Sequence, residues 1–351
     1  MDIQLEDILQ RENIVRQNQE DLRDFYIGKK VLVTGGGGSI GQSIILELIN
    51  LGVTDYVALD RDENALHSLQ LQIGGSALFD DKRIRLCDIR DLDSCLELFH
   101  TFKPDVVIHA AAHKHLSALE QQPREAFLTN VVGTRNVLDA SNIVKTKIFI
   151  NISTDKAAEP VSVLGMSKRV AEYLVDEMGE SQIKFSVRFG NVFASKGSVI
   201  ETFVFQITNN LPVTLTHLEV ERYFMSNSEA AYLVLESATL EKSGLFALDM
   251  GKPIKMKLVI EKIAEKLNKK AVIEVTGLRP GEKISEVVSG SSESVSKTSL
   301  NKILSVSKNE EITFKHPTEG SLISFLRDLN LSKKVITHRT AKEFFGKIHF
   351  S

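Results

Sequence analysis

The sequence predicts an α/β fold: a Rossmann-like, doubly wound parallel sheet joined to a smaller part of mixed α/β structure. Two observations support this prediction. Between residues 29 and 189, short apolar runs alternate with segments whose apolar residues recur at helical spacing, which is typical of parallel βαβ units with right-handed crossovers. A run of four glycines follows the first apolar run, as at the phosphate-binding turn of doubly wound folds.

The first strand is expected at 30–34 (KVLVT), because this apolar run is short and ends at glycines. A helix follows at 39–51, where the apolar residues have helical spacing. Further strands are expected at 55–60, 83–86, 105–109, 147–153 and 184–189, separated by helices at 61–73, 92–102, 123–142 and 160–178. Beyond about residue 195 the pattern is less regular.

Three regions are expected along the chain. Residues 1–26 form an N-terminal helical extension that packs on the main domain through apolar side chains: Leu5, Ile8, Leu9 and Leu22. Residues 27–194 form a dinucleotide-binding domain, and 195–351 are mainly a substrate-binding part, partly interleaved with it. The Ser-rich stretch 289–299 is expected to be a surface loop.

Composition excludes several classes of function. The 351 residues are 42% hydrophobic and 25% charged, with a net charge of -3, so no basic excess is present for binding nucleic acid. No apolar run reaches the ~20 residues of a membrane span, and the polar N-terminus is not a signal peptide. Cys87 and Cys95 lack metal-ligand spacing. We therefore expect a cytoplasmic protein with reduced thiols.

The glycine run fits two registers, Gly36-x-Gly38-x-x-Gly41 and Gly35-x-x-Gly38-x-x-Gly41. In both, glycines allow a tight turn and a close approach of the backbone to a pyrophosphate, and the next helix offers it free N–H groups. Alone this motif is weak. Its place between a buried strand and a helix makes it specific for a dinucleotide.

Asp60 follows Gly41 by 19 residues and ends the next expected strand, where an acid suits the adenosine ribose hydroxyls. It favours NAD as the cofactor. The adjacent Arg61 would suit a 2′-phosphate, so NADP stays possible. Asp88, after the third strand, is either a ligand of the adenine edge or a surface carboxylate.

A group of reactive side chains is expected at the carboxyl end of the strand at 147–153. Ser153, Thr154, Asp155 and Lys156 are consecutive, and Lys168 begins a helical pattern shortly after. This is the sheet edge at which doubly wound folds bind their ligands. By residue type alone, Asp155 and Lys156 could also be a solvated ion pair, which is the less favoured interpretation.

Seven stretches, in order from residue 31 to 283, resemble one protein family: VLVTGGGGSIG, HAAAHKHLSALE, STDKAAEPVSVLGMSKRVAE, RFGNVFASKGSVIETFVFQI, LTHLEVERYFM, LDMGKPIK and GLRPGEK. They are similar to the extended short-chain dehydrogenases/reductases of the polysaccharide-biosynthesis (CapD-like) type, the UDP-N-acetylglucosamine 4,6-dehydratases. The resemblance covers about four-fifths of the chain. It implies a bound, internally recycled NAD and a nucleotide-sugar substrate.

The resemblance implies a reaction without net redox: oxidation at carbon 4, elimination of water across carbons 5 and 6, and reduction at carbon 6. Asp155 would be the acid for the leaving hydroxyl and Lys156 the base for the carbon-5 proton. A free Lys has a pKa near ~10.4, so neutralising it at pH 7 costs roughly 4–5 kcal/mol. Burial of the site and the positive nicotinamide would reduce this cost.

Leu164 departs from the wider superfamily, in which a Tyr four residues before the helix Lys takes the sugar hydroxyl proton. Members of this branch resemble the chain in lacking that Tyr. Leucine cannot transfer protons, so Thr154, Asp155, Lys168 or a water must do so. A non-catalytic protein remains an alternative, as does a nucleotide-sugar 4-epimerase or 4-ketoreductase, which would need the missing Tyr.

The motifs and the resemblance together give three sets of site residues. Catalysis is assigned to Asp155, Lys156, Thr154 and Lys168. Cofactor binding is assigned to Gly35, Gly38, Ser39, Ile40, Gly41, Asp60, Arg61, Asp88, Ile89, Ala110, Ala111, Ala112, Asn130, Ser153 and Lys168. Substrate binding is assigned to Lys114, Asn191, Ser195, Lys196, Gly197, Ser198, Val199, Arg222, Arg279 and Glu282.

Within these sets, Lys168 is expected at the nicotinamide ribose. Asn130 is expected at an active-site water or the backbone, or else as a packing residue. Arg279 suits phosphate or ribose. His113 and His115 are expected to line the pocket without binding metal. The resemblance also implies a homo-oligomer, and it leaves open UDP or GDP and retention or inversion at carbon 5.

Overall fold

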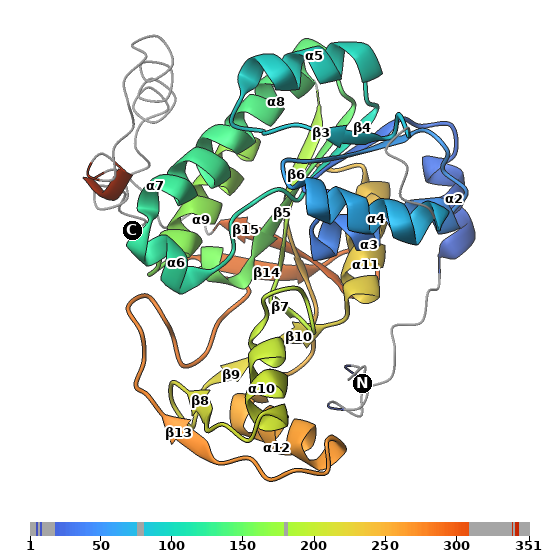
Figure 1. Ribbon diagram of the computed structural model, residues 1–351. Coiled ribbons are helices and arrows are strands. Elements are labelled where there is room, and N and C mark those ends of the chain that lie inside the picture. Colours follow the sequence, from blue (N-terminus) through green and yellow to red (C-terminus); the bar gives the residue numbers. More distant parts are fainter. Residues whose placement is uncertain are drawn as a thin grey trace.

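The computed structural model describes residues 5, 8, 18–75, 81–178, 182–308, 339 and 341–343. Its main body is a nine-stranded sheet in the order β14-β15-β11-β6-β5-β4-β1-β2-β3 (Figure 1). Six of the strands are those expected: β1 (Val31–Thr34), β2 (Tyr56–Asp60), β3 (Ile84–Leu86), β4 (Val106–His109), β5 (Ile148–Thr154) and β6 (Ile183–Phe189). They pair in parallel, which confirms the predicted doubly wound sheet.

Both faces of the sheet are buried under helices (Figure 1). In β1, Val31 and Val33 belong to one core cluster and Leu32 to the other, as the alternation of side chains along a strand requires. One face is covered by α2 (Gln19–Tyr26), α3 (Ser39–Asn50), α4 (Glu63–Gly74) and α11 (Asn227–Ser237). The other is covered by α5 (Leu92–Phe102), α8 (Thr134–Ile143) and α9 (Val163–Glu177).

The helix predicted at 123–142 is present but not regular. It comprises α7 (Pro123–Ala126), a π-helical stretch at Phe127–Gly133, and α8. A short helix, α6 (Leu116–Gln121), precedes it. Single-turn π-bulges occur frequently at functional sites, and this one contains Asn130.

A smaller body lies below the main sheet in Figure 1. Its helices are α10 (Val199–Thr208) and α12 (Met256–Lys266), which share a separate apolar core. Short strand pairs complete it: β7 (Asn191–Val192) with β10 (Phe224–Met225), β8 (Val213–Leu215) with β13 (Ile273–Val275), and β9 (Glu221–Arg222) with β12 (Ile254–Lys255).

The chain passes between the two bodies more than once, so a single cut at residue 194 does not divide the fold. After the first passage, α11 and β11 (Gly244–Leu248) return to the main body, and β11 pairs with β6 in parallel. After the second, β14 (Glu293–Lys297) and β15 (Ile303–Lys308) add an antiparallel edge. The division of function between 27–194 and 195–351 stays a prediction.

Two local predictions need correction. The stretch 289–299, expected as a surface loop, contains β14, whose polar side chains suit an edge strand because backbone pairing with β15 holds it. In the N-terminal extension, Leu22 packs on the main body as expected, whereas Leu5 and Ile8 contact the smaller core. Leu9 lies outside the described residues.

Candidate active site

The glycine turn after β1 is shaped by contacts that exclude side chains. Gly35 has φ +67°, and a Cβ added there would lie 2.7 Å from the Ala111 nitrogen. A Cβ at Gly41 would lie 2.1 Å from the Gly35 carbonyl oxygen. Gly38 caps the start of α3, and Ser39 and Ile40 form its first turn. The turn therefore leaves the helix N-terminus open to an anionic group.

Asp60 ends β2 beside this turn. Its Oδ2 accepts a hydrogen bond from the Gly37 N–H at 3.0 Å, and its Oδ1 accepts one from the Asp62 N–H at 3.0 Å. The carboxylate is thereby fixed next to the glycine turn, where the sequence places the ribose ligand. Contact of Asp60 with a ribose stays a prediction.

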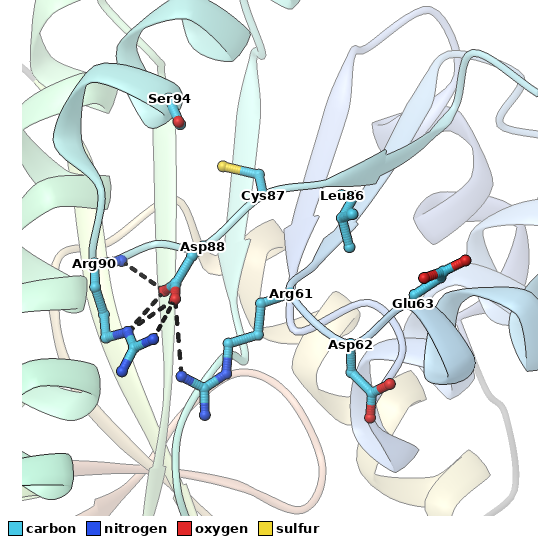
Figure 2. Close-up of a pocket in the computed structure, with 8 residues that line it drawn as sticks. All are labelled: Arg61, Asp62, Glu63, Leu86, Cys87, Asp88, Arg90 and Ser94. Carbon is cyan, nitrogen blue, oxygen red and sulfur yellow. Dashed lines mark hydrogen bonds and ion pairs between the residues drawn. The ribbon is translucent and has the colours of Figure 1, made fainter.

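A cavity of about 720 Å³ lies at the ends of β2 and β3, with Asp88 on its wall (Figure 2). Asp88 Oδ2 lies 2.5 Å from Arg90 Nη2 and 3.8 Å from Arg61 Nη1, and these cations lower the pKa of the carboxyl against the effect of burial. Arg61 Nη2 also lies 2.9 Å from His113 Nε2. Arg61 and Asp88 thus belong to one charged network, rather than being isolated surface groups.

Asn130 joins the loop after β4 to α9 by three hydrogen bonds, two to the loop and one to the helix. Its Oδ1 accepts from the His113 N–H at 2.8 Å, and its Nδ2 donates to the His113 carbonyl at 3.0 Å and to Ser167 Oγ at 2.9 Å. Of the alternatives left open by the sequence, the structure gives Asn130 a backbone-binding role. The loop that it holds contains Ala110, Ala111 and Ala112, while Ile89 is buried nearby under the π-helical turn.

Asp155 and Lys156 lie at the carboxyl end of β5, in a single 3₁₀ turn. Asp155 is 1% exposed, and its Oδ1 accepts hydrogen bonds from Thr154 Oγ1 at 2.9 Å and from Lys156 Nζ at 3.0 Å. Its Oδ2 is buried and has no hydrogen-bond partner among the described residues. Asp155 is therefore buried and Lys156 is only 17% exposed, which differs from the solvated ion pair that the sequence also allowed; a catalytic role for the pair stays a prediction.

Sequence reasoning missed Glu286, which lies 3.9 Å from Lys156 Nζ through its Oε1. Its side chain is 3% exposed, and burial raises the pKa of its carboxyl. No local signal marked it, because it stands in the polar stretch after the RPGE motif, far along the chain from Lys156.

Lys168 and Leu164 lie on the first turns of α9. Lys168 is 5% exposed, and burial lowers the pKa of its ammonium group to about 8. Leu164 is buried in the apolar core beneath the helix. The position at which the resemblance to the wider superfamily leads one to expect a Tyr is therefore occupied by a packing residue.

Behind the site lies a buried charge cluster that the sequence did not reveal, formed by Arg188, Glu172, Glu293 and Arg169. Arg188 is fully buried and donates to both carboxylates, to Glu172 Oε1 at 2.7 Å and to Glu293 Oε2 at 2.7 Å. Ser153, predicted to contact the cofactor, donates to Glu172 Oε1 at 2.5 Å. Its hydroxyl thus links the strand that carries the reactive pair to this cluster.

The loop at 195–199 approaches both the glycine turn and Lys114. Lys114 Nζ donates to Ser195 Oγ at 3.2 Å, and burial lowers the pKa of this lysine. The Lys196 N–H donates to Ser39 Oγ at 3.0 Å. Ser198 caps α10, which begins at Val199, and its Oγ is buried without a partner in the described part of the chain.

Gly197 completes this loop with φ +69°, and a Cβ added there would lie 2.7 Å from the His115 ring. Asn191, at the start of β7, pairs through its backbone N–H with the Tyr223 carbonyl oxygen. Of this region, the structure places the loop at 195–199 beside the start of α3 through the Lys196–Ser39 hydrogen bond, and substrate contact by these residues stays a prediction.

Arg222 is engaged with the protein itself. Its guanidinium donates to the carbonyl oxygens of Lys283 and Ile284 at 2.9 Å each, and it lies 3.5 Å from Glu282 Oε1. Glu282 Oε1 also accepts from Thr216 Oγ1. In this structure the two residues hold the chain after the RPGE motif, and their contact with substrate stays a prediction.

The side chain of Arg279 is not part of these contacts: the residue is exposed at the turn, and its backbone N–H donates to Glu282 Oε2 at 3.3 Å. Among the described residues, no helix is long and apolar enough to cross a membrane, and no group of three or more His, Cys, Asp or Glu side chains could hold a metal ion.

Comparison with known proteins matches this chain along most of its length. It is 40% identical over 299 residues to the probable polysaccharide biosynthesis protein EpsC of Bacillus subtilis, and 38% identical over 295 residues to the capsular polysaccharide biosynthesis protein CapD of Staphylococcus aureus. Each match covers 81% of this chain and 49% of the relative, so the chain spans about half the length of these relatives. A UDP-glucose 4-epimerase of Rickettsia rickettsii is 30% identical over 278 residues, 76% of this chain and 80% of that protein.

Among solved structures, Pen from Bacillus thuringiensis superposes with a TM-score of 0.71 at 32% identity, over 82% of this chain and 89% of that one. The dTDP-glucose 4,6-dehydratase DesIV of Streptomyces venezuelae, with NAD and TYD bound, gives 0.65 at 18% identity over 74% and 88%, which shows the shared fold. The family model described as polysaccharide biosynthesis protein matches residues 31–308. The chain belongs to the polysaccharide biosynthesis protein family.

Proposed function

We propose that the protein is a nucleotide-sugar 4,6-dehydratase that converts a UDP-N-acetylhexosamine, UDP-N-acetylglucosamine in the first place, to its 4-keto-6-deoxy derivative. The observation that supports this most is the buried Asp155–Lys156 pair at the carboxyl end of β5. Oxidation alone needs one base, whereas elimination needs an acid and a second base. The pair supplies both.

The described residues fit NAD as the cofactor. The glycine turn is a cradle that a Cβ at Gly35 or Gly41 would fill, and it opens at the N-terminus of α3. Asp60 is fixed beside the turn, where its carboxylate suits ribose hydroxyls and repels a 2′-phosphate. Arg61 is held by His113 and Asp88, which disfavours NADP. When bound, the nicotinamide would accept a hydride from carbon 4 of the sugar and return it to carbon 6.

The protein's own groups carry the proton transfers. Lys156 takes the carbon-5 proton, which the 4-keto group makes acidic, and Asp155 gives a proton to the leaving 6-hydroxyl. Since Leu164 is a packing residue, we assign the 4-hydroxyl proton to Thr154, whose Oγ1 donates to Asp155 Oδ1 at 2.9 Å. Through Thr154, the proton lost from the 4-hydroxyl can thus reach Asp155, which then protonates the leaving 6-hydroxyl.

On the substrate side, Lys114 and the start of α10 supply cationic and N–H groups for the diphosphate. Arg279 is exposed and free to turn toward it. A homo-oligomer and a cytoplasmic location stay predictions. The relatives named for polysaccharide biosynthesis suggest that the product is used for a surface glycan.

The test is incubation of the purified protein with UDP-N-acetylglucosamine in deuterated water, without added NAD, followed by proton NMR of the sugar. We expect a 4-keto-6-deoxy product with deuterium at carbon 5, whose configuration also reports retention or inversion. A 4-epimer with carbon 6 intact would show an epimerase, the activity named for the Rickettsia relative. No conversion of UDP or GDP sugars, even with added NAD, would overturn the proposal.

A further inference from the structure

Lys156 lies between two carboxyl groups, and only one of them belongs to the predicted pair. Asp155 Oδ1 is 3.0 Å from Lys156 Nζ, and Glu286 Oε1 is 3.9 Å from the same nitrogen. The Lys156 side chain is 17% exposed and that of Glu286 is 3% exposed. The roles proposed for Asp155 and Lys156 leave the buried Glu286 carboxyl without a function.

The segment that carries Glu286 is held on the loop of Lys156 at both ends. On one side, Gly281 packs so closely that an added Cβ would lie 2.7 Å from Ser162 Cβ. On the other, a Cβ at Gly290 would lie 2.7 Å from the Ala158 carbonyl oxygen. Figure 1 shows this stretch running from β13 back to β14 at the main sheet. Glu286 is therefore fixed against Lys156 rather than being a mobile surface residue.

The surroundings of Glu286 favour proton uptake. Burial raises the pKa of its carboxyl; among the charged groups that face it, Lys156, Arg222 and Lys283 lower this pKa, and Asp155 raises it. Lys156 itself faces Asp155 and Glu286. A bound sugar would cover the remaining exposed part of Lys156. Exclusion of water would penalise the ion pair relative to an uncharged amine and carboxylic acid.

We propose that Glu286 acts through Lys156 as its proton acceptor, so that a filled site holds Lys156 as the neutral amine that takes the carbon-5 proton. In this step, which requires the 3.9 Å between Lys156 Nζ and Glu286 Oε1 to close to hydrogen-bonding distance, an N–H bond of Lys156 breaks and an O–H bond of Glu286 forms, with no change in the net charge of the site. The proton returns to Lys156 after carbon 5 has been reprotonated. Glu286 is thus a positioning and proton-holding residue, and this role rests on the proposed dehydratase function.

The test compares three variants with the wild-type holoenzyme. Glu286→Gln keeps the shape of the side chain but cannot accept a proton, and Glu286→Asp keeps the carboxyl one methylene further away. Glu219→Gln is the matched control, because Glu219 pairs with Lys255 on the exposed surface. Thermal melting establishes that each variant is folded.

Two steps are followed with UDP-N-acetylglucosamine: reduction of the nicotinamide by absorbance, and formation of the 4-keto-6-deoxy product by NMR. We expect Glu286→Gln to reduce the nicotinamide at the wild-type rate but to form product about a hundredfold more slowly at neutral pH, the low end of a general acid–base contribution. The reduced cofactor then accumulates. Glu219→Gln should match the wild type in both steps.

The pH dependence separates proton uptake from a structural role. The wild type should vary little across neutral pH, because the shared proton stays within the site. Product formation by Glu286→Gln should rise about tenfold per pH unit, because Lys156 must then lose its proton to water. Glu286→Asp should restore the weak pH dependence at a reduced rate.

Equal slowing of both steps with an unchanged pH profile would show that Glu286 only anchors its segment. An unchanged rate in Glu286→Gln would also overturn the inference, while leaving the dehydratase function intact. A wild-type protein that dehydrates no nucleotide sugar would instead overturn the proposed function and this inference with it.

Discussion

Removal of the Glu293 carboxylate should destabilise the protein in a pH-dependent way. Its side chain is 1% exposed and joins β14 to Arg188 of β6 and Arg169 of α9. Burial alone would raise the pKa of Glu293, but the hydrogen bonds and charge of Arg188, with Arg169, lower it from 4.5 to about 2. The folded state therefore stabilises the ionised form strongly.

The magnitude follows from linkage. The difference between 4.5 and about 2 corresponds to about 3 kcal/mol, at about 1.4 kcal/mol per pH unit. Because the folded pKa is the lower one, this stability is present above about pH 4.5 and is lost as the pH falls toward about 2. Breaking a buried ion pair costs about 3–5 kcal/mol in general, which agrees.

The assay is guanidinium unfolding of the wild type and Glu293→Gln between about pH 7 and about pH 3. We expect the variant to be about 3 kcal/mol less stable near pH 7, and the difference to fall to about half near pH 3. Glu219→Gln, in an exposed pair, should change stability little at either pH. A difference for Glu293→Gln that stays constant with pH would refute the reasoning, because lost packing does not titrate.

Two further predictions concern residues assigned to cofactor binding. Lys168→Met should raise the free energy of unfolding by about 3 kcal/mol near pH 7, because burial lowers the pKa of Lys168 from 10.5 to about 8 and the charged form is thus disfavoured in the fold. For the same reason, the wild type should gain stability as the pH rises from about 8 to 10.5, because Lys168 is protonated in the unfolded chain and neutral in the folded one over this range. A wild type without this gain, or a Lys168→Met variant less stable than the wild type, would contradict the lowered pKa of Lys168. Gly41→Ala should abolish NAD binding in a calorimetric titration and destabilise the fold by about 1–3 kcal/mol, since its Cβ would lie 2.1 Å from the Gly35 carbonyl. Gly74→Ala, at a glycine whose added Cβ would meet nothing within 4 Å, is the control, and equal NAD affinity in the two variants would count against the predicted cradle.

The parts of the fold that the sequence predicted are those set by local pattern. The six strands from β1 to β6 were recognisable because both faces of a parallel sheet are buried, so each strand is a short apolar run. The glycine turn was recognisable because its backbone tolerates no side chain at Gly35 or Gly41. In the same way, Asp155 and Lys156 were found because they follow a strand directly.

The residues that the sequence did not reveal depend on contacts between distant segments. Glu286 and Glu293 stand in a polar, Ser-containing stretch that resembles a surface loop, yet both are buried. Arg188 lies within a strand pattern, and nothing near it in sequence indicates that its charge would be fully buried. Glu172 and Glu293, its partners, come from α9 and β14. Only the folded arrangement brings these charges together.

The stretch from Arg279 to Glu293 connects these findings. It leaves the smaller body through the carbonyl oxygens that Arg222 binds, passes Lys156 at Glu286, and reaches the main sheet where Glu293 meets Arg188. One end is thus attached to the body expected to hold the sugar nucleotide, and the other to the strand beside the reactive pair. The position of Glu286 beside Lys156 is therefore set by contacts that the same segment makes with both bodies.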